Sequence, residues 1–116
     1  MIEVEWAKLP GGGWFNFWIH PSKDSNLEGK EGIYIIFDSN QVYVFIGRGM
    51  IKGHLLKHQQ SYEFKEYPTD LWYTWAELTH YYQVTVERYL LTRFRPILNH
   101  ELPNPLEGQV AINLTY

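Results

Sequence analysis

The fold of this chain is decided by Gly32-Ile33-Tyr34-Ile35-Ile36-Phe37, the turn Asp38-Ser39-Asn40, and Val42-Tyr43-Val44-Phe45-Ile46-Gly47. β-Branched and aromatic residues fill both outer runs, and three polar residues that favour turns separate them. This pattern predicts two antiparallel strands joined as a hairpin. Because side chains alternate along a strand, it also predicts that Tyr43 and Phe45 lie on one face of the sheet.

Helical and strand patterns follow the hairpin. Ile51 and Leu55 are four residues apart, which predicts a short helix over residues 50–60. Residues 71–78 are typical of a third strand, although a buried helix fits the same run of apolar residues. The longest helical pattern repeats every four residues and stops before Pro96, and its members are Tyr82, Val86, Leu90 and Phe94. We therefore expect an α+β fold with a small central antiparallel sheet of about three strands flanked by helices.

The length of 116 residues predicts one domain spanning residues 1–116. We expect its core at residues 31–100, preceded by an aromatic extension and a loop at 1–30. The aromatic run at residues 14–19 is expected to be an extended segment laid on the core. A tail at 101–116 is expected to end in an edge strand or a docked segment over 109–116.

Composition excludes several classes of protein. The 45% hydrophobic and 17% aromatic content is enough for a packed core and excludes a disordered tail. The absence of cysteine excludes disulfides, thiolate zinc sites and a cysteine nucleophile. Acidic residues near the N-terminus and the lack of a long apolar run favour a soluble cytoplasmic protein without a membrane partner.

The net charge of −3 hides two locally basic stretches. Between Ser39 and Tyr62 there is no acidic residue, while Arg48, Lys52 and Lys57 are present. The stretch 81–100 places three arginines around the single acid Glu87. These stretches favour a nucleic-acid partner, and a solvated charged face is the ordinary alternative.

The ordered motifs of residues 31–100 resemble the GIY-YIG nuclease superfamily. Gly32-Ile33-Tyr34 matches the first triplet, and Phe45-Ile46-Gly47 stands where the second belongs, with ten residues between them. Downstream, Glu87 resembles the acid that the family carries on a helix. Asn99, twelve residues later, resembles the Asn of its closing Pro-x-x-Asn motif, which begins here at Pro96.

The resemblance implies a divalent-metal-dependent endonuclease acting on nucleic acid, with DNA favoured over RNA. It assigns catalysis to Tyr34, as general base or water-positioning group, and to His54, His58 and Glu87. It places Mg²⁺ on Glu87, with Mn²⁺ as a possible substitute, because one carboxylate plus water and phosphate oxygens suits that ion. It assigns contacts to substrate or phosphate to Arg48, Lys52, Tyr43 and Asn99. Of these, Asn99 is interpreted as a residue that supports the others.

Two residues depart from the family pattern. Phe45 replaces the second tyrosine, so a hydroxyl is missing unless Tyr43 supplies one from the same strand face. His54 stands four residues before His58, where the family has a catalytic arginine. A histidine side chain is charged only below about pH 6.5, whereas an arginine keeps its charge. His54, or Arg48 or Lys52 swinging inward, must then supply the phosphate charge.

Other interpretations of these residues stay open. The chain could be a catalytically degenerate domain of the same fold that binds nucleic acid or a protein. Glu87 could be a surface acid paired with Arg88 or Arg95, and Tyr34 a core tyrosine. Asn99 could equally be a capping or turn residue after Pro96. His54 and His58 have the spacing of a zinc pair, with Glu87, His80 or His100 as a third ligand. The aromatic residues favour a core or a homodimer patch over a base-stacking platform, and these are Trp14, Trp18, Trp72 and Trp75. An active enzyme of this size would need a homodimer, a partner subunit or a structured substrate.

Overall fold

The predicted hairpin forms and lies within a larger sheet. In the computed structural model, which describes residues 2–100, 102 and 112–115, β3 (Glu31–Phe37) and β4 (Tyr43–Met50) pair antiparallel. The predicted third strand, β5 (Trp72–Glu77), pairs antiparallel with the other side of β3, and the short β2 (Phe15–Asn16) pairs with β5. The strand order is therefore β2-β5-β3-β4, one strand more than expected. Of the aromatic run at 14–19, only β2 is a strand.

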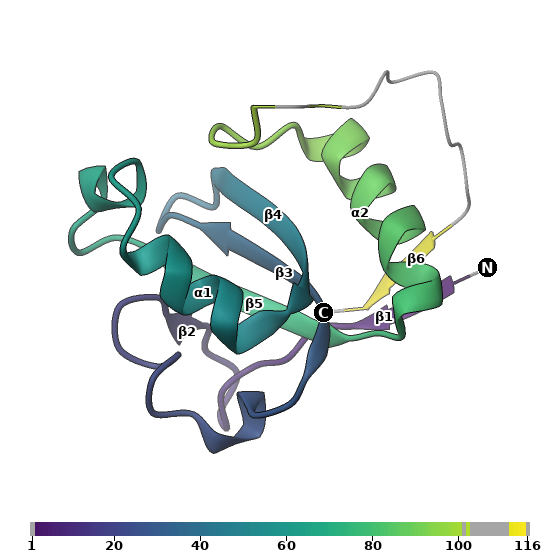
Figure 1. Cartoon of the computed structure of the whole chain (residues 1–116), viewed down its shortest axis with the longest axis horizontal. Helices are drawn as coiled ribbons and strands as arrows, with labels where there is room; N and C mark the ends of the chain where they lie inside the picture. Colours follow the sequence, from purple (N-terminus) through teal and green to yellow (C-terminus); the bar gives the residue numbers. More distant parts are fainter. Residues whose placement is uncertain (1, 101, 103–111, 116) are drawn as a thin grey trace.

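The two predicted helices cover opposite faces of this sheet (Figure 1). α1 (Ile51–Gln59) follows β4 directly, and α2 (His80–Phe94) follows β5. Both helices contact β3 and β4. Two short 3₁₀ segments, η1 (Ser25–Leu27) and η2 (Phe64–Glu66), lie in the connections. The antiparallel sheet and its two α-helices confirm the α+β class.

Each face of the sheet has its own hydrophobic core. Tyr34 and Ile36 of β3 pack with Ile51 and Leu55 of α1 on one face, called here the α1 face. The other face, called here the α2 face, buries these residues of β3 and α2: Ile33, Ile35, Phe37, Val86 and Leu90. The alternation of β3 between two buried faces explains why its sequence is apolar throughout.

A β-bulge in β4 overturns the expected placement of Tyr43. Ile36 is opposite Phe45, but the next residue, Phe37, is opposite Tyr43, so β4 has one extra residue at this point. An extra residue reverses the alternation of side chains beyond it. Tyr43 therefore packs on the α2 face and Phe45 on the α1 face. The prediction that they share a face was wrong, because a simple period of two does not anticipate a bulge.

A second, two-stranded sheet joins the ends of the described chain. β1 (Ile2–Glu5) pairs in parallel with β6 (Ile112–Thr115), and Val4 and Trp6 are buried in the core of the α2 face. β6 confirms a C-terminal strand, while residues 109–111 and 116 of the expected segment lie outside the described residues. Among the described residues, the search for a helix with the length and hydropathy of a membrane span found none.

Candidate active site

Tyr34 is held beside a glycine in the neighbouring strand. Its side chain lies on the α1 face and is 1% exposed. Gly47 is its partner across the β3–β4 ladder, and a Cβ atom at Gly47 would lie 2.4 Å from the Tyr34 hydroxyl oxygen. Only glycine therefore leaves room for the phenol ring to reach across β4.

The Tyr34 hydroxyl forms a hydrogen bond with His58 of α1. The distance from Tyr34 Oη to His58 Nε2 is 2.7 Å. Two phenylalanine rings fix the imidazole in place, with ring centroids 4.5 Å away for Phe45 and 4.7 Å away for Phe64. Phe45, which replaces the expected tyrosine, thus supplies an apolar wall for His58 in place of a hydroxyl.

Burial determines which partner in this hydrogen bond carries the proton. Burial, helped by the positive charges of His54 and Lys57, lowers the pKa of His58 to about 4. Burial also raises the pKa of Tyr34, and the negative charge of Glu87 raises it further. Near neutral pH the phenol is therefore protonated and donates to the Nε2 atom of a neutral imidazole.

His54 lies one turn before His58, on the exposed side of α1. Its ring centroid is 6.2 Å from that of Tyr34. A Cβ atom at Gly49 would lie 2.9 Å from His54 Nε2, and the φ angle of Gly49 is +117°, which L-residues rarely adopt. Gly49 therefore lets the imidazole pack close against the end of β4.

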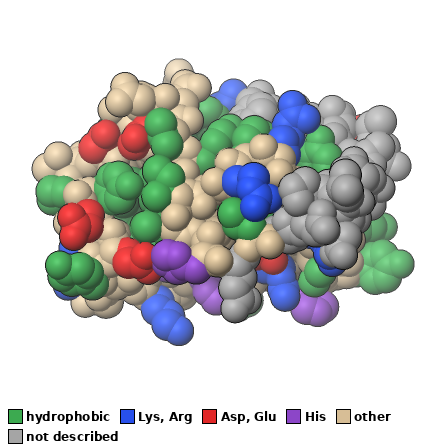
Figure 2. All heavy atoms as spheres, turned by 90° about the horizontal axis from the view of Figure 1, so that it is seen from above, with side chains coloured by type: hydrophobic (Ala, Val, Ile, Leu, Met, Phe, Trp, Pro, Cys, Tyr) green, Lys and Arg blue, Asp and Glu red, His purple; other side chains and the backbone are tan. Residues whose placement is uncertain are grey.

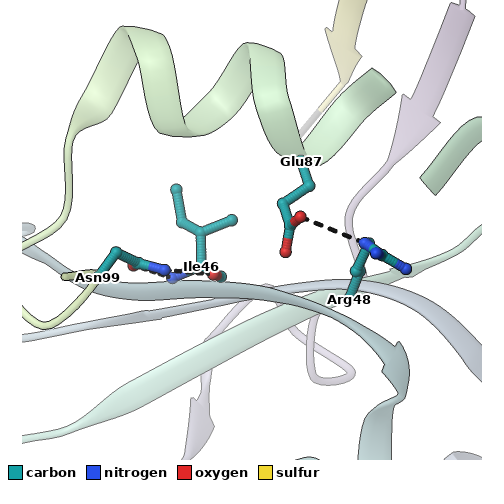
Figure 3. Close-up of polar contacts among 4 residues, drawn as sticks. All are labelled: Ile46, Arg48, Glu87 and Asn99. Atoms are coloured by element: carbon teal, nitrogen blue, oxygen red, sulfur yellow. Dashed lines mark hydrogen bonds and ion pairs between the residues drawn. The ribbon is translucent and has the colours of Figure 1, made fainter. Parts of the chain in front are cut away.

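Glu87 points from α2 toward β4 and meets Arg48 (Figure 3). The Arg48 Nε atom lies 3.2 Å from Glu87 Oε1, and the Glu87 side chain is 25% exposed. Burial raises the pKa of the Glu87 carboxyl, while the Arg48 charge and hydrogen bond act in the opposite direction. Among the described residues, Glu87 therefore forms an ion pair with Arg48, the residue that follows the second motif triplet.

Asn99 supports the strand that carries the motif. Its side-chain Oδ1 accepts the N–H of Ile46, and its Nδ2 donates to the Ile46 carbonyl, both at 2.9 Å (Figure 3). Residues 97 and 98 also donate backbone hydrogen bonds to β4. This segment therefore covers the outer edge of β4 as far as Ile46, next to Gly47 and Arg48. Both bonds of the amide side chain agree with the interpretation of Asn99 as a support residue.

Two predicted phosphate-binding residues lie apart from this group. Lys52 pairs with the carboxylate of Glu28. Tyr43 packs against Phe94 on the α2 face, with ring centroids 4.4 Å apart. Because Tyr43 and Tyr34 lie on opposite faces of the sheet, Tyr43 does not replace the hydroxyl that Phe45 lacks.

The metal-binding capacity of the site rests on one carboxylate. Within residues 2–100, 102 and 112–115, no three His, Asp or Glu side chains form a metal-binding group. Glu87 is a hard oxygen donor, which is the type of ligand that Mg²⁺ prefers. A cation there would take its other ligands from water and from a substrate phosphate.

Several contributors to the site were missed by sequence reasoning. Phe64, from η2, packs on His58, and its position in a polar stretch gives no signal of this role. The Arg48–Glu87 pair joins residues 39 positions apart. Gly49 had a usable signal, because a glycine between a strand and a helix often marks a close approach of the backbone.

The surface around the sheet carries both signs of charge. Figure 2 shows acidic side chains mostly toward the left of the view, and basic side chains mostly toward its centre and right. Hydrophobic side chains are interspersed among both. This mixed surface agrees with the small net charge of the chain and with a basic region limited to part of the molecule.

Comparison with known proteins gives no further identification. No protein-family model, curated protein or solved structure matches this chain. The interpretation of the site therefore depends on its residues and their geometry.

Proposed function

We propose that the chain is a divergent GIY-YIG-type endonuclease that hydrolyses phosphodiester bonds in nucleic acid with a divalent cation, and that DNA rather than RNA is its substrate. The observation that carries the proposal is the convergence of three motif residues. Tyr34 from β3 and His58 from α1 share a hydrogen bond, and the charge of Glu87 from α2 reaches the Tyr34 hydroxyl. Around Gly47 and Arg48 of β4, the Tyr34–His58 pair lies on the α1 face and Glu87 approaches from the α2 side.

The Tyr34–His58 pair provides a route for the proton of the attacking water. In the proposed reaction, water oxygen bonds to phosphorus and the bond to the leaving oxygen breaks. The water proton passes to Tyr34 Oη while the phenol proton passes to His58 Nε2. The leaving oxygen takes a proton from solvent. Near neutral pH the phenol carries its own proton, so it can accept the water proton only by passing that proton to a partner. The neutral imidazole of His58 is that partner, and its lowered pKa makes it a weak base.

Charge on the phosphate would be neutralised by residues on the exposed side of the pair. His54 is exposed and lies beside the Tyr34 ring, so it is the nearest substitute for the missing arginine. Arg48 is held by Glu87 and would contact phosphate after that pair opens. A divalent cation on Glu87 would supply electrostatic stabilisation of the negative charge that develops on the phosphate oxygens.

A cleavage assay with a matched pair of variants tests the proposal. Supercoiled plasmid, branched DNA, single strands and structured RNA are incubated with Mg²⁺ or Mn²⁺ between pH 6 and 9. We expect Glu87→Gln to lower metal-dependent cleavage by about 10²–10³-fold, the usual cost of removing one electrostatic stabiliser. Glu66→Gln, which neutralises an exposed acid in η2, should cleave as the unmodified chain does. Full activity in Glu87→Gln would remove the metal assignment.

The second candidate function is a binding module of the same fold without catalysis. Two observations favour it: Phe45 replaces a hydroxyl with an apolar ring, and Arg48 already occupies the Glu87 carboxylate. Binding of nucleic acid without cleavage under every condition, unaffected by Glu87→Gln, would identify this function. In that case we expect a dimer or a partner subunit to contribute to the affinity for nucleic acid.

A further inference from the structure

A cavity lies on the α1 face beside the row of residues that contains Tyr34. Its volume is about 500 Å³, which is within the range of small-molecule sites. Trp75, one of its walls, is the partner of Tyr34 across the β3–β5 ladder and packs against the same core. Its other walls come from the chain after β1, from β2 and from the loop after β2, and include Leu9, Phe15, His20, Lys23 and Asp24.

Two buried hydrogen-bonding groups without described partners belong to Trp75 and to Tyr73, which stacks on a wall residue of the cavity. The indole Nε1 of Trp75 and the hydroxyl of Tyr73 are both buried, and neither has a hydrogen-bond partner in the part of the chain that the structure describes. Tyr73 is fully buried and stacks on Phe15, a wall residue, with ring centroids 5.2 Å apart. Burial raises the pKa of Tyr73, and the charge of the wall residue Asp24 raises it further. Buried polar groups normally have partners, so these two call for internal water.

Polar side chains at the rim of the cavity offer hydrogen-bond donors, an acceptor and a positive charge. His20 Nδ1 accepts the N–H of Asn16 at 2.9 Å, so its Nε2 is left to donate. Lys23 is exposed and brings a positive charge. Asp24 uses its Oδ1 atom to accept the N–H of Asn26, which leaves Oδ2 as an acceptor. The cavity therefore offers aromatic walls for a flat ring, the Asp24 carboxylate as an acceptor for its edge, and the donors of Lys23 and His20 for an anion.

We propose that this cavity binds one nucleotide, with its base against Trp75 and its phosphate at Lys23 and His20. Aromatic side chains bind bases by stacking with little dependence on sequence. The nucleotide is either a free nucleoside monophosphate or the unpaired end of a strand, and the second source rests on the proposed function. Because Trp75 lies next to Tyr34 in the sheet, a strand end held here would be anchored near the candidate active site.

The first arm of the test titrates adenosine 5′-monophosphate into the full chain without metal. The readout is the indole N–H signal of Trp75 in nuclear magnetic resonance spectra, assigned with Trp75→Phe. We expect the signal to shift saturably, and Lys23→Gln to weaken binding about tenfold through loss of a charge-assisted contact. Adenosine without phosphate should bind more weakly by a similar factor. The matched control is Lys57→Gln, an exposed lysine of α1 outside the cavity lining, which should leave binding unchanged.

The second arm distinguishes the two sources of the nucleotide. A short DNA single strand carrying a 5′-phosphate competes with adenosine 5′-monophosphate on the Glu87→Gln variant, in which cleavage plays no part. Displacement of the mononucleotide supports the strand end, and binding of the mononucleotide without displacement supports a free nucleotide. An unshifted Trp75 signal at millimolar ligand, or a shift that Lys23→Gln leaves unchanged, overturns the proposal. Either result leaves the cleavage assay to decide the nuclease function separately.

Discussion

The two sides of β4 near Gly47 differ in how their functional groups are held. On the α1 face, Tyr34 and His58 form a buried, neutral hydrogen bond enclosed by aromatic rings. On the α2 face, Arg48 and Glu87 form a charged pair that is partly exposed to solvent. The first pair is fixed by packing, whereas the second is held by an interaction that a cation or a phosphate can replace. In the proposed reaction, the proton route would therefore be preformed, whereas the charges that meet the phosphate would be adjustable.

The largest effect is expected from removing the hydroxyl of the buried pair. Tyr34→Phe keeps the ring but deletes the proton route, so we expect turnover to fall about 10²–10⁴-fold while the affinity for substrate stays the same. Single-turnover cleavage and a binding assay measure the two quantities separately. Tyr62→Phe removes an exposed hydroxyl and serves as the control. An unchanged rate in Tyr34→Phe would show that another group activates the water.

The close approach of Gly47 to Tyr34 gives a test on stability. Gly47→Ala places a methyl group 2.4 Å from the Tyr34 hydroxyl oxygen, so the ring or β4 must move. We expect a loss of about 1–3 kcal/mol in the free energy of unfolding, together with a loss of activity. Gly53→Ala, in α1, meets no atom within 4 Å and should stabilise the chain by about 0.5–1 kcal/mol. Urea unfolding of both variants measures the difference, and equal effects would contradict the packing argument.

How much of this arrangement the sequence predicts depends on how far apart the interacting residues lie along the chain. The hairpin, α1 and α2 are local patterns, and each was predicted close to its observed bounds. The bulge that separates Tyr43 from Phe45 was missed, because it depends on how β4 pairs with β3. The alternation of Ile2-Glu3-Val4-Glu5 was a usable signal for β1, but its partner β6 lies over a hundred residues away.

The candidate site follows the same division between local and long-range information. Tyr34, His58 and Glu87 were predicted as site residues because the resemblance carries an ordered motif. The Arg48–Glu87 pair and the double hydrogen bond of Asn99 to Ile46 were missed, because both require the packing of distant segments. Lys52 was predicted as a nearby basic residue that could swing inward, and Tyr43 because simple alternation put it on the face of Phe45. Their observed contacts are with Glu28 and Phe94.

The lowered pKa of His58 predicts a pH dependence of stability. Because the pKa is about 4 in the folded chain and about 6.5 in an unfolded chain, the unfolded state binds more protons between these values. Stability should therefore be complete above about pH 6.5 and decrease as the pH falls toward 4, by on the order of 2 kcal/mol. Urea unfolding at several pH values measures this slope. In His58→Gln the free energy of unfolding should change less with pH. An unchanged pH dependence in this variant would show that other groups cause it.

The smallest effect concerns His54 on the exposed side of the buried pair. A histidine side chain in general carries less charge at pH 8 than at pH 6, whereas an arginine keeps its charge, so an arginine at position 54 would serve a phosphate oxygen better at the higher pH. We therefore expect His54→Arg to raise cleavage more at pH 8 than at pH 6, by about a few-fold. His58 stays neutral across this interval and does not add to the difference. His80→Arg, at the exposed start of α2, introduces the same charge away from the site and should change neither rate. An equal gain at both pH values would mean that His54 acts through its shape or its hydrogen bonds, and that the phosphate charge comes from Arg48 across β4.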